Sequence, residues 1–304
     1  MRAPQATMVV NLDTTNPGHV IACCGLLELA HRQCPAVEGW FDGPRFLISI
    51  PGESEGNALS HLVNTLTRCQ ISGLSLTERD DRDRLEKESR QLKKQGSKLP
   101  PDQEQRRRDL GERARAGLIQ IEEPFRLILD WWQAGDEDAT PKTWAGLQEL
   151  HKIARAAQDA LAGATELALL LDYGCILRMP AEYCKAKADG QKAVEPFYFD
   201  ARRFAHALDA GFSLDTQDAE TIAHPAVELL CLVGLQRFRP APALVRGTFD
   251  YWTWGHPLGA LVAAPVFSGV SPIPGRQGYR FRLRFRDDQK RYKAFDFATP
   301  VGGE

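Results

Sequence analysis

Arginine alternates with apolar residues near the C-terminus of this 304-residue chain. Within the stretch YRFRLRFR, arginine stands at every second position, as Arg280, Arg282, Arg284 and Arg286. Successive side chains of a β-strand point to opposite faces, so this spacing predicts a strand with arginines on one face and apolar residues on the other. Like charges on one face repel one another unless they are solvated or neutralised, and nucleic-acid phosphates would neutralise them.

More basic residues flank this stretch. DDQK is typical of a hairpin turn, and six further candidates lie on either side of the alternation: Lys290, Arg291, Lys293, Arg237, Arg239 and Arg246. We interpret these residues, together with the four alternating arginines, as contacts to a nucleic-acid backbone. The alternative is the ordinary solvated face of an antiparallel sheet. Trp252 and Trp254 are candidates for stacking on bases, although tryptophans at this spacing are also typical of core packing.

The stretch NPGHVIACCGLLELAHR (16–32) joins loop residues to two adjacent cysteines. Pro17 removes a backbone donor and no Lys-Ser/Thr pair follows, which excludes a phosphate-binding loop. Adjacent Cα atoms lie about 3.8 Å apart, closer than the usual span of a disulfide. We predict instead a helix capped by Asn16 with Pro17 at its first position, in which Cys23 and Cys24 pack as small apolar side chains.

Signatures of catalysis do not occur in the sequence. GxSxG, HExxH and SxxK are missing, and the seven histidines are scattered singly. The seven cysteines are odd in number and include no CxxC pair, which favours neither a disulfide framework nor a zinc site. We therefore expect a non-enzymatic protein without catalytic residues, bound metal or cofactor. One alternative to a purely structural helix remains. His19 lies near the N-terminus of the predicted helix, where it could face an anionic ligand.

The elements that would position these residues alternate irregularly along the chain. Strands are predicted at 7–13, 45–50, 124–132, 247–254, 279–285 and 291–297. Helices are predicted at 17–32, 55–68, 143–162, 200–212 and 225–238. The segment 165–173 fits either a strand or a short buried helix. Mixed helices and mostly antiparallel strands, with a strand-rich C-terminus, predict a single α+β domain over residues 1–304.

A charged segment at 72–122 interrupts this pattern. Residues 78–115 contain thirteen Lys/Arg and ten Asp/Glu, with many oppositely charged pairs at i,i+4 spacing. Leu85, Leu92 and Leu99 form one thin apolar seam, and GSKLPP breaks the helical pattern. We predict that 72–122 is an insertion, either a helical hairpin or a partly disordered segment.

Overall composition sets further limits. Hydrophobic residues make up 43% of the chain and its formal net charge is -2, so the chain is neither disordered throughout nor a polycation. The N-terminus lacks the apolar core of a signal peptide, and no apolar run approaches the roughly 18 residues of a membrane helix. We expect a cytoplasmic protein without a membrane partner.

Four blocks of sequence resemble one family: VNLDTTNPGHVIACCGLLELAHR, FYFDARRFAHALDAGFSL, PAVELLCLVGLQRFRP and FDYWTWGHPLGALVAA. They are similar to the large-subunit-type CRISPR-associated proteins of type I-U (I-G) Cascade-like effector complexes. The resemblance reaches from residue 8 to about residue 270 and skips the insertion. It implies a subunit of an RNA-guided DNA surveillance complex, with crRNA, target DNA and the other Cascade-type subunits as partners. It transfers no catalytic motif and no assigned DNA contact to this chain.

This resemblance implies a non-catalytic nucleic-acid-binding subunit that helps to recognise the motif flanking target DNA and to stabilise the opened strand. In RNA-guided recognition, base pairing reads the sequence while protein reads the flanking motif and the backbone. Two alternatives stay open. One is a metal-dependent nuclease that uses dispersed Asp and His residues, and the other is a purely architectural subunit that contacts only proteins.

Overall fold

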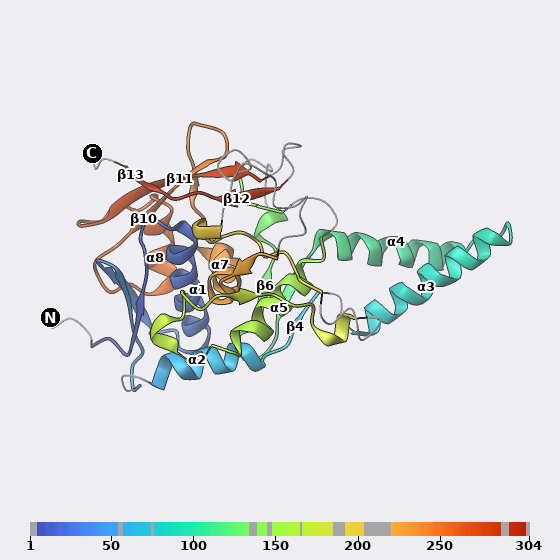
Figure 1. Ribbon diagram of the computed structural model, residues 1–304, viewed down its shortest axis with the longest axis horizontal. Coiled ribbons are helices and arrows are strands. Elements are labelled where there is room, and N and C mark those ends of the chain that lie inside the picture. The colour runs from blue at the N-terminus through green and yellow to red at the C-terminus, as the bar shows by residue number, and fades with distance from the viewer. Residues whose placement is uncertain are drawn as a thin grey trace.

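A computed structural model of the chain describes residues 5–53, 57–73, 76–133, 139–144, 148–164, 166–184, 192–203, 220–286 and 292–301. Helices and mostly antiparallel strands form a compact body, and one helical hairpin projects from it (Figure 1). The predicted α+β class is confirmed. Within the described ranges, no helix is long and apolar enough to cross a membrane.

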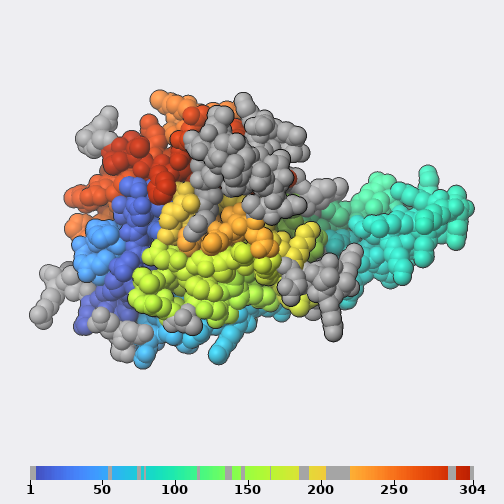
Figure 2. Space-filling model, viewed as in Figure 1, coloured from blue at the N-terminus to red at the C-terminus, as the bar shows by residue number. Residues whose placement is uncertain are grey.

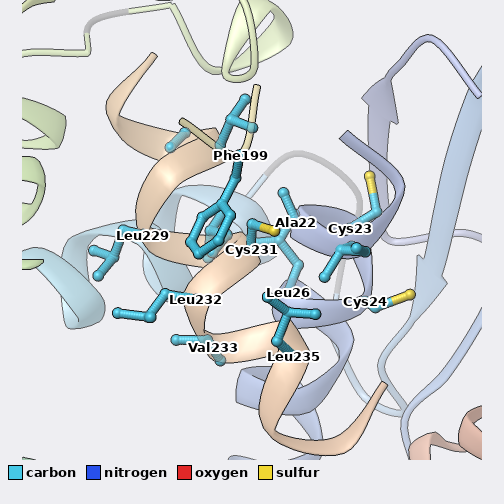
Figure 3. Close-up of a cluster of buried hydrophobic side chains, with 14 of the residues drawn as sticks. Ala22, Cys23, Cys24, Leu26, Phe199, Leu229, Cys231, Leu232, Val233 and Leu235 are labelled. Atoms are coloured by element: carbon cyan, nitrogen blue, oxygen red, sulfur yellow. The ribbon is translucent and has the colours of Figure 1, made fainter. Parts of the chain in front are cut away.

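Two helices, α1 (Pro17–Gln33) and α7 (Pro225–Arg237), pack side by side at the centre of the body (Figure 3). Asn16 caps α1 as predicted, because its side chain accepts a hydrogen bond from the Gly18 N–H. Both helices are buried on nearly every side, so their sequences show little amphipathic contrast. Cys23 and Cys24 are fully buried as predicted, and burial raises the pKa of both thiols.

A small antiparallel sheet lies against α1 and contains β1 (Met8–Asn11), β2 (Glu38–Asp42) and β3 (Arg45–Ser49). The strand order is β1-β3-β2, with Met8 opposite Ile48 and Trp40 opposite Leu47. Phe46 and Ile48 alternate into the core. The sequence predicts β1 and β3 but not β2, because EGWFD is short and acidic at both ends.

The C-terminal sheet has the order β12-β11-β10-β9, and β13 also pairs with β11. Its elements are β9 (Ala241–Pro242), β10 (Thr248–Thr253), β11 (Gln277–Phe285), β12 (Lys293–Phe295) and β13 (Thr299–Val301). Helix α8 (Ala260–Phe267) lies between β10 and β11 in sequence and packs on β10. The inner face of this sheet contributes stacked rings to the core, including Tyr251 on Tyr279.

Shorter elements complete the body around α7. Helices α2 (Asn57–Arg68) and α5 (Leu150–Leu161) are amphipathic and pack on one another. The small strands are β4 (Ile71–Ser72), β5 (Ile119–Ile121), β6 (Leu127–Leu129), β7 (Cys175–Ile176) and β8 (Ile222–Ala223). Single 3₁₀ turns lie at Trp131–Gln133, Leu167–Leu169, Ala181–Tyr183 and Ala201–Arg203.

The charged insertion contains a pair of antiparallel helices, α3 (Leu76–Lys94) and α4 (Pro101–Ala116), which extend away from the body (Figure 1). Leu85, Leu99 and Leu110 are buried between them. A few apolar side chains along one side of each helix are therefore sufficient to pack the two helices together, and the remaining surface is charged and solvated.

Three predicted segments differ from the structure. The strand predicted at 124–132 is confined to β6, and the helix predicted at 143–162 begins only at Leu150. Trp144 lies outside that helix and is nevertheless buried, because its ring packs on Trp131, Trp132 and Phe197. Of the helix predicted at 200–212, a single 3₁₀ turn is present and the remainder lies outside the described residues.

Glycines allow α1 and α7 to approach closely, and this generates a prediction. A Cβ added to Gly25 would overlap the Leu230 carbonyl oxygen, whereas one added to Gly111 on α4 would meet no atom within 4 Å. We expect Gly25→Ala to destabilise the fold by several kcal/mol, since two backbones must separate and leave cavities that cost about 2–5 kcal/mol. Gly111→Ala should stabilise the fold by up to about 1 kcal/mol through helix propensity.

Chemical denaturation of both variants measures this difference. Gly111→Ala is the matched control, because it makes the same chemical change within a helix. Equal unfolding free energies for the two variants would contradict close packing of α1 on α7.

Candidate nucleic-acid interface

The predicted two-faced strand is present in β11. Tyr279, Phe281 and Leu283 are buried, while Arg280, Arg282 and Arg284 are exposed on the opposite face. The alternation follows from strand geometry, because aromatic and aliphatic side chains at every second position cover the core and leave the arginines in solvent. Three of the four alternating arginines therefore lie on one outer face of the C-terminal sheet.

The register of β10 against β11 decides what accompanies the arginines on this face. Asp250 lies opposite Arg280, and Trp252 lies opposite Gly278. The lack of a side chain at Gly278 makes room for the indole, since a Cβ there would approach Trp252 Nε1 to 2.8 Å. The Arg276 guanidinium lies over the half-buried Trp252 ring, 5.3 Å from its centroid. We use the name outer face for the surface formed by Trp252, Arg276, Arg280, Arg282 and Arg284.

Carboxylates neutralise part of the outer face. Arg280 donates from Nε and Nη2 to the two oxygens of Asp250, both at 2.6 Å. Arg284 forms an ion pair with Asp296. Within the described part of the chain, no ion pair or side-chain hydrogen bond involves the Arg282 guanidinium, which lies between these two pairs. Arg282 is therefore the cation on this face that is most available to an external anion.

Arg286 departs from the row, because β11 ends at Phe285. Its guanidinium stacks on the ring of Tyr198, 3.4 Å from the centroid, and lies 3.3 Å from Glu195 Oε2. Only 11% of the Arg286 side chain is exposed. Arg286 thus joins the sheet to the segment before Asp200 instead of extending the exposed row.

The remaining predicted contacts are dispersed. Arg239 is exposed before β9, and Arg246 is exposed in the loop between β9 and β10. Lys293 is half-buried, and its Nζ lies 5.7 Å from the centroid of the Phe285 ring. Arg237 binds the buried carboxylate of Glu28, so its charge is used inside the fold. Lys290 and Arg291 lie outside the described residues.

Arg276 is the member of the outer face that the sequence prediction missed. It lies just before β11, four residues before Arg280, and contacts Trp252 of β10. A signal was available in the sequence, because Arg276 keeps the two-residue period of the arginines and only Gly278 interrupts the row.

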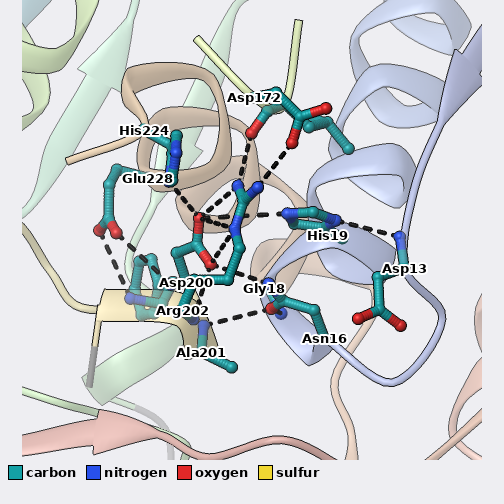
Figure 4. Close-up of polar contacts among 12 residues, drawn as sticks. Asp13, Asn16, Gly18, His19, Asp172, Asp200, Ala201, Arg202, His224 and Glu228 are labelled. Atoms are coloured by element: carbon teal, nitrogen blue, oxygen red, sulfur yellow. Dashed lines mark hydrogen bonds and ion pairs between the residues drawn. The ribbon is translucent and has the colours of Figure 1, made fainter. Parts of the chain in front are cut away.

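A second polar cluster lies in the interior, where the N-termini of α1 and α7 meet (Figure 4). Its centre is the fully buried carboxylate of Asp200. Asn16 Nδ2 donates to Asp200 Oδ1 at 2.8 Å, Arg202 Nη2 donates to Oδ2 at 2.8 Å, and His224 Nδ1 lies 2.6 Å from Oδ2. These donors lower the pKa of Asp200 well below its usual range, although burial opposes them.

Two neighbours of Asp200 are held neutral. Burial and the charge of Asp200 raise the pKa of Glu228 to about 8, so the Glu228 carboxyl is largely protonated at neutral pH. Burial lowers the pKa of His19 to about 4. The backbone N–H of Asp13 donates to His19 Nδ1 at 3.1 Å, which places the proton of the neutral ring on Nε2. His19 Nε2 is buried, has no hydrogen-bond partner and lies 4.0 Å from Asp200 Oδ2.

This interior cluster is built to join helix ends. The Asp200 oxygens are occupied by donors, and none of the described cavities is lined by Asp200, His19 or Glu228. Among the described residues, no group of three or more His, Cys, Asp and Glu side chains is arranged to bind a metal ion. The position of His19 beside Asp200 follows from packing of the α1 N-terminus against Phe199 and Asp200.

Comparison of the chain with family models, with curated proteins and with solved structures finds no match.

The buried histidine generates a prediction for acid stability. Unfolded His19 titrates near pH 6.5, whereas the folded pKa is about 4, so between these values only the unfolded chain binds the proton. Stability contributed by neutral His19 therefore falls as pH falls through this window, by about 3 kcal/mol in total. The contribution of Glu228 to stability changes in the opposite direction and rises as pH falls from about 8 to 4.5, because in this range only the folded chain binds the proton.

The difference in unfolding free energy between the wild type and His19→Gln isolates the histidine. We expect this difference to shrink by roughly 2–3 kcal/mol between pH of about 7 and about 4.5. His61→Gln, at an exposed position on α2, is the control. A pH-independent difference for His19→Gln would show that His19 is not held neutral by the fold.

Proposed function

We propose that this protein is a non-catalytic nucleic-acid-binding subunit and that the outer face contacts the nucleic-acid backbone. The observation that carries the proposal is the position of Arg282. It is exposed, lacks an ion pair within the described residues, and lies on one flat strand face between Arg280 and Arg284. An unneutralised guanidinium in this setting is suited to a phosphate, which accepts two parallel N–H bonds from it.

The neighbouring arginines contribute through their unused donors. Because Arg280 uses Nε and Nη2 for Asp250, its Nη1 group still carries two N–H donors. Alternate residues of a strand lie about 6.6–6.8 Å apart, close to the separation of successive phosphates in an extended strand. The outer face can therefore follow a backbone with Arg282 as the main contact and Arg280 as a secondary one.

Trp252 and Arg276 extend the same face toward the other end of β11. Gly269 packs against the six-membered ring of the half-buried indole and Arg276 lies over it, so the exposed part of the ring lies beside a positive charge. Aromatic and arginine planes of this kind stack on unpaired bases without strong sequence preference. This supports binding of an opened strand as well as of a duplex backbone.

The sequence resemblance supplies the biological setting of the proposal. In a type I-U-like CRISPR effector complex in the cytoplasm, the partners would be crRNA, target DNA and the other Cascade-type subunits. The subunit would help to recognise the flanking motif and to stabilise the displaced strand, while base pairing reads the target sequence. Metal-dependent cleavage of DNA by the purified protein in Mg²⁺ or Mn²⁺ would contradict this assignment.

Salt dependence of DNA binding tests the role of Arg282. Each phosphate contact on duplex DNA contributes about 0.9 to the slope of log affinity against log salt concentration. We expect Arg282→Ala to reduce this slope by about 1 and to weaken binding about equally across sequences. Stability should change by less than about 0.5 kcal/mol, because the side chain is solvated.

Arg45→Ala is the matched control for this measurement. Arg45 is an exposed arginine on β3, in a different sheet, so its removal changes the net charge equally. If Arg282→Ala and Arg45→Ala give the same slope, the outer face is an ordinary solvated sheet surface.

A further inference from the structure

Charges are segregated along the α3–α4 hairpin. On the part nearer the body, arginines are matched by carboxylates, both within a helix and between the two helices. Examples are Arg84 with Asp81, Arg106 with Asp81, and Arg113 with Glu78. The net charge of this part of the hairpin is therefore small, and its ion pairs lie in solvent where they attract other charges only weakly.

The end of the hairpin has a different character. Residues 89–101 contain four Lys/Arg and no Asp/Glu, and the first turn of α4 adds Asp102 and Glu104. Of the four basic residues, Arg90 is paired with Glu86. Lys93, Lys94 and Lys98 are exposed around the turn at Gly96, whose φ of 73° lets the chain reverse. Within the described ranges, none of these three lysines forms an ion pair. We call Lys93, Lys94 and Lys98 the lysine tip.

A hollow of about 670 Å³ adjoins the lysine tip. It is lined by Lys93 from α3, by Lys98 from the turn, and by Gln105 and Arg108 from α4. This volume is ample for a sugar-phosphate unit. Glu104, which also lines the hollow, is occupied by Arg107 and Arg108.

We propose that the lysine tip is a second nucleic-acid contact, which binds phosphates of the same molecule that the outer face binds. This inference rests on the proposed function. A protein partner fits the tip less well, because protein interfaces need an apolar centre and are depleted in lysine. No large exposed hydrophobic side chain lies on the hairpin among the described residues.

The length of the hairpin sets a lower limit on the separation of the two contacts, because the outer face lies on the body and the tip lies at the far end of the hairpin (Figure 1). The 19 residues of α3 span about 28 Å, which corresponds to about eight base pairs of duplex. Figure 2 shows the hairpin standing clear of the body, so its tip is reachable from several directions. A nucleic acid bound at the outer face must therefore exceed about eight base pairs before it also reaches the lysine tip.

A length comparison tests this inference. The tip variant is Lys93→Gln, Lys94→Gln and Lys98→Gln in the full chain, and the control variant is Arg84→Gln, Lys87→Gln and Arg113→Gln nearer the body. Both remove three positive charges from the hairpin. Affinity is measured over a salt series for a duplex of about 40 base pairs and for a DNA hairpin with a stem of about 8 base pairs.

We expect the tip variant to reduce the salt slope by about 2–3 on the long duplex and to leave the slope on the short stem unchanged. The control variant should change the slope by less than about 1 on either DNA. Equal slopes for tip and control variants on the long duplex overturn the inference. An equal reduction on both DNAs also overturns it, because the tip would then bind without the reach that the hairpin provides.

The proposed function fails separately from this inference. The proposed function is contradicted if Arg282→Ala and Arg45→Ala give the same slope of log affinity against log salt on the short stem, which the lysine tip does not reach. If Arg282→Ala retains its effect while the tip and control variants coincide, the outer face binds nucleic acid and the lysine tip does not.

Discussion

Close contact between α1 and α7 is the constraint on which the rest of the fold depends. Gly25 lies against the Leu230 carbonyl and Gly234 against the Ile21 carbonyl, so backbone meets backbone with no side chain between. The two helices run in the same direction, because both N-termini meet Asp200 and the Glu28–Arg237 pair joins them further along. The helix dipoles of a parallel pair place positive ends together, and the buried ionised carboxylate of Asp200 offsets them.

This helix pair positions the outer face through a few long-range hydrogen bonds. Tyr251 donates to the Thr14 carbonyl at 2.7 Å, just before α1 begins. Trp254 donates to the Gly39 carbonyl on β2 at 2.7 Å, beside Leu27 of α1. Strand β10 is thus joined to the loop before α1 and, through the residue that follows it, to the sheet beside α1, and β11 follows by its register with β10. The exposed arginines owe their common orientation to contacts made on the buried side of the sheet.

Sequence patterns predict correctly those elements that depend on interactions between residues close in sequence. The Asn16 cap, the buried helix at Pro225–Arg237 and the alternation in β11 each depend on residues close in sequence. The spacing of Trp144 fits a helix, yet its burial comes from rings on two other segments, Trp131 and Trp132 on one and Phe197 on the other. Contacts between residues far apart in sequence could not be predicted, and these decide which charges of the candidate site are free.

The number of arginines in this protein differs from the number that can bind an external anion, because carboxylates of the same chain pair with several of them. Arg237 and Glu28 lie 209 residues apart, and their pairing removes Arg237 from any external role. Asp250, Asp296 and Glu195 do the same in part for three arginines of the predicted row. Neutralisation within the sheet lowers the repulsion that four adjacent guanidinium groups would otherwise cause, and it allows the free chain to fold with them. The same neutralisation concentrates the attraction for phosphate at Arg282 and at cations outside the row. An isolated chain with this distribution offers few phosphate contacts, so under the proposed function tight binding would depend on contacts added by other subunits.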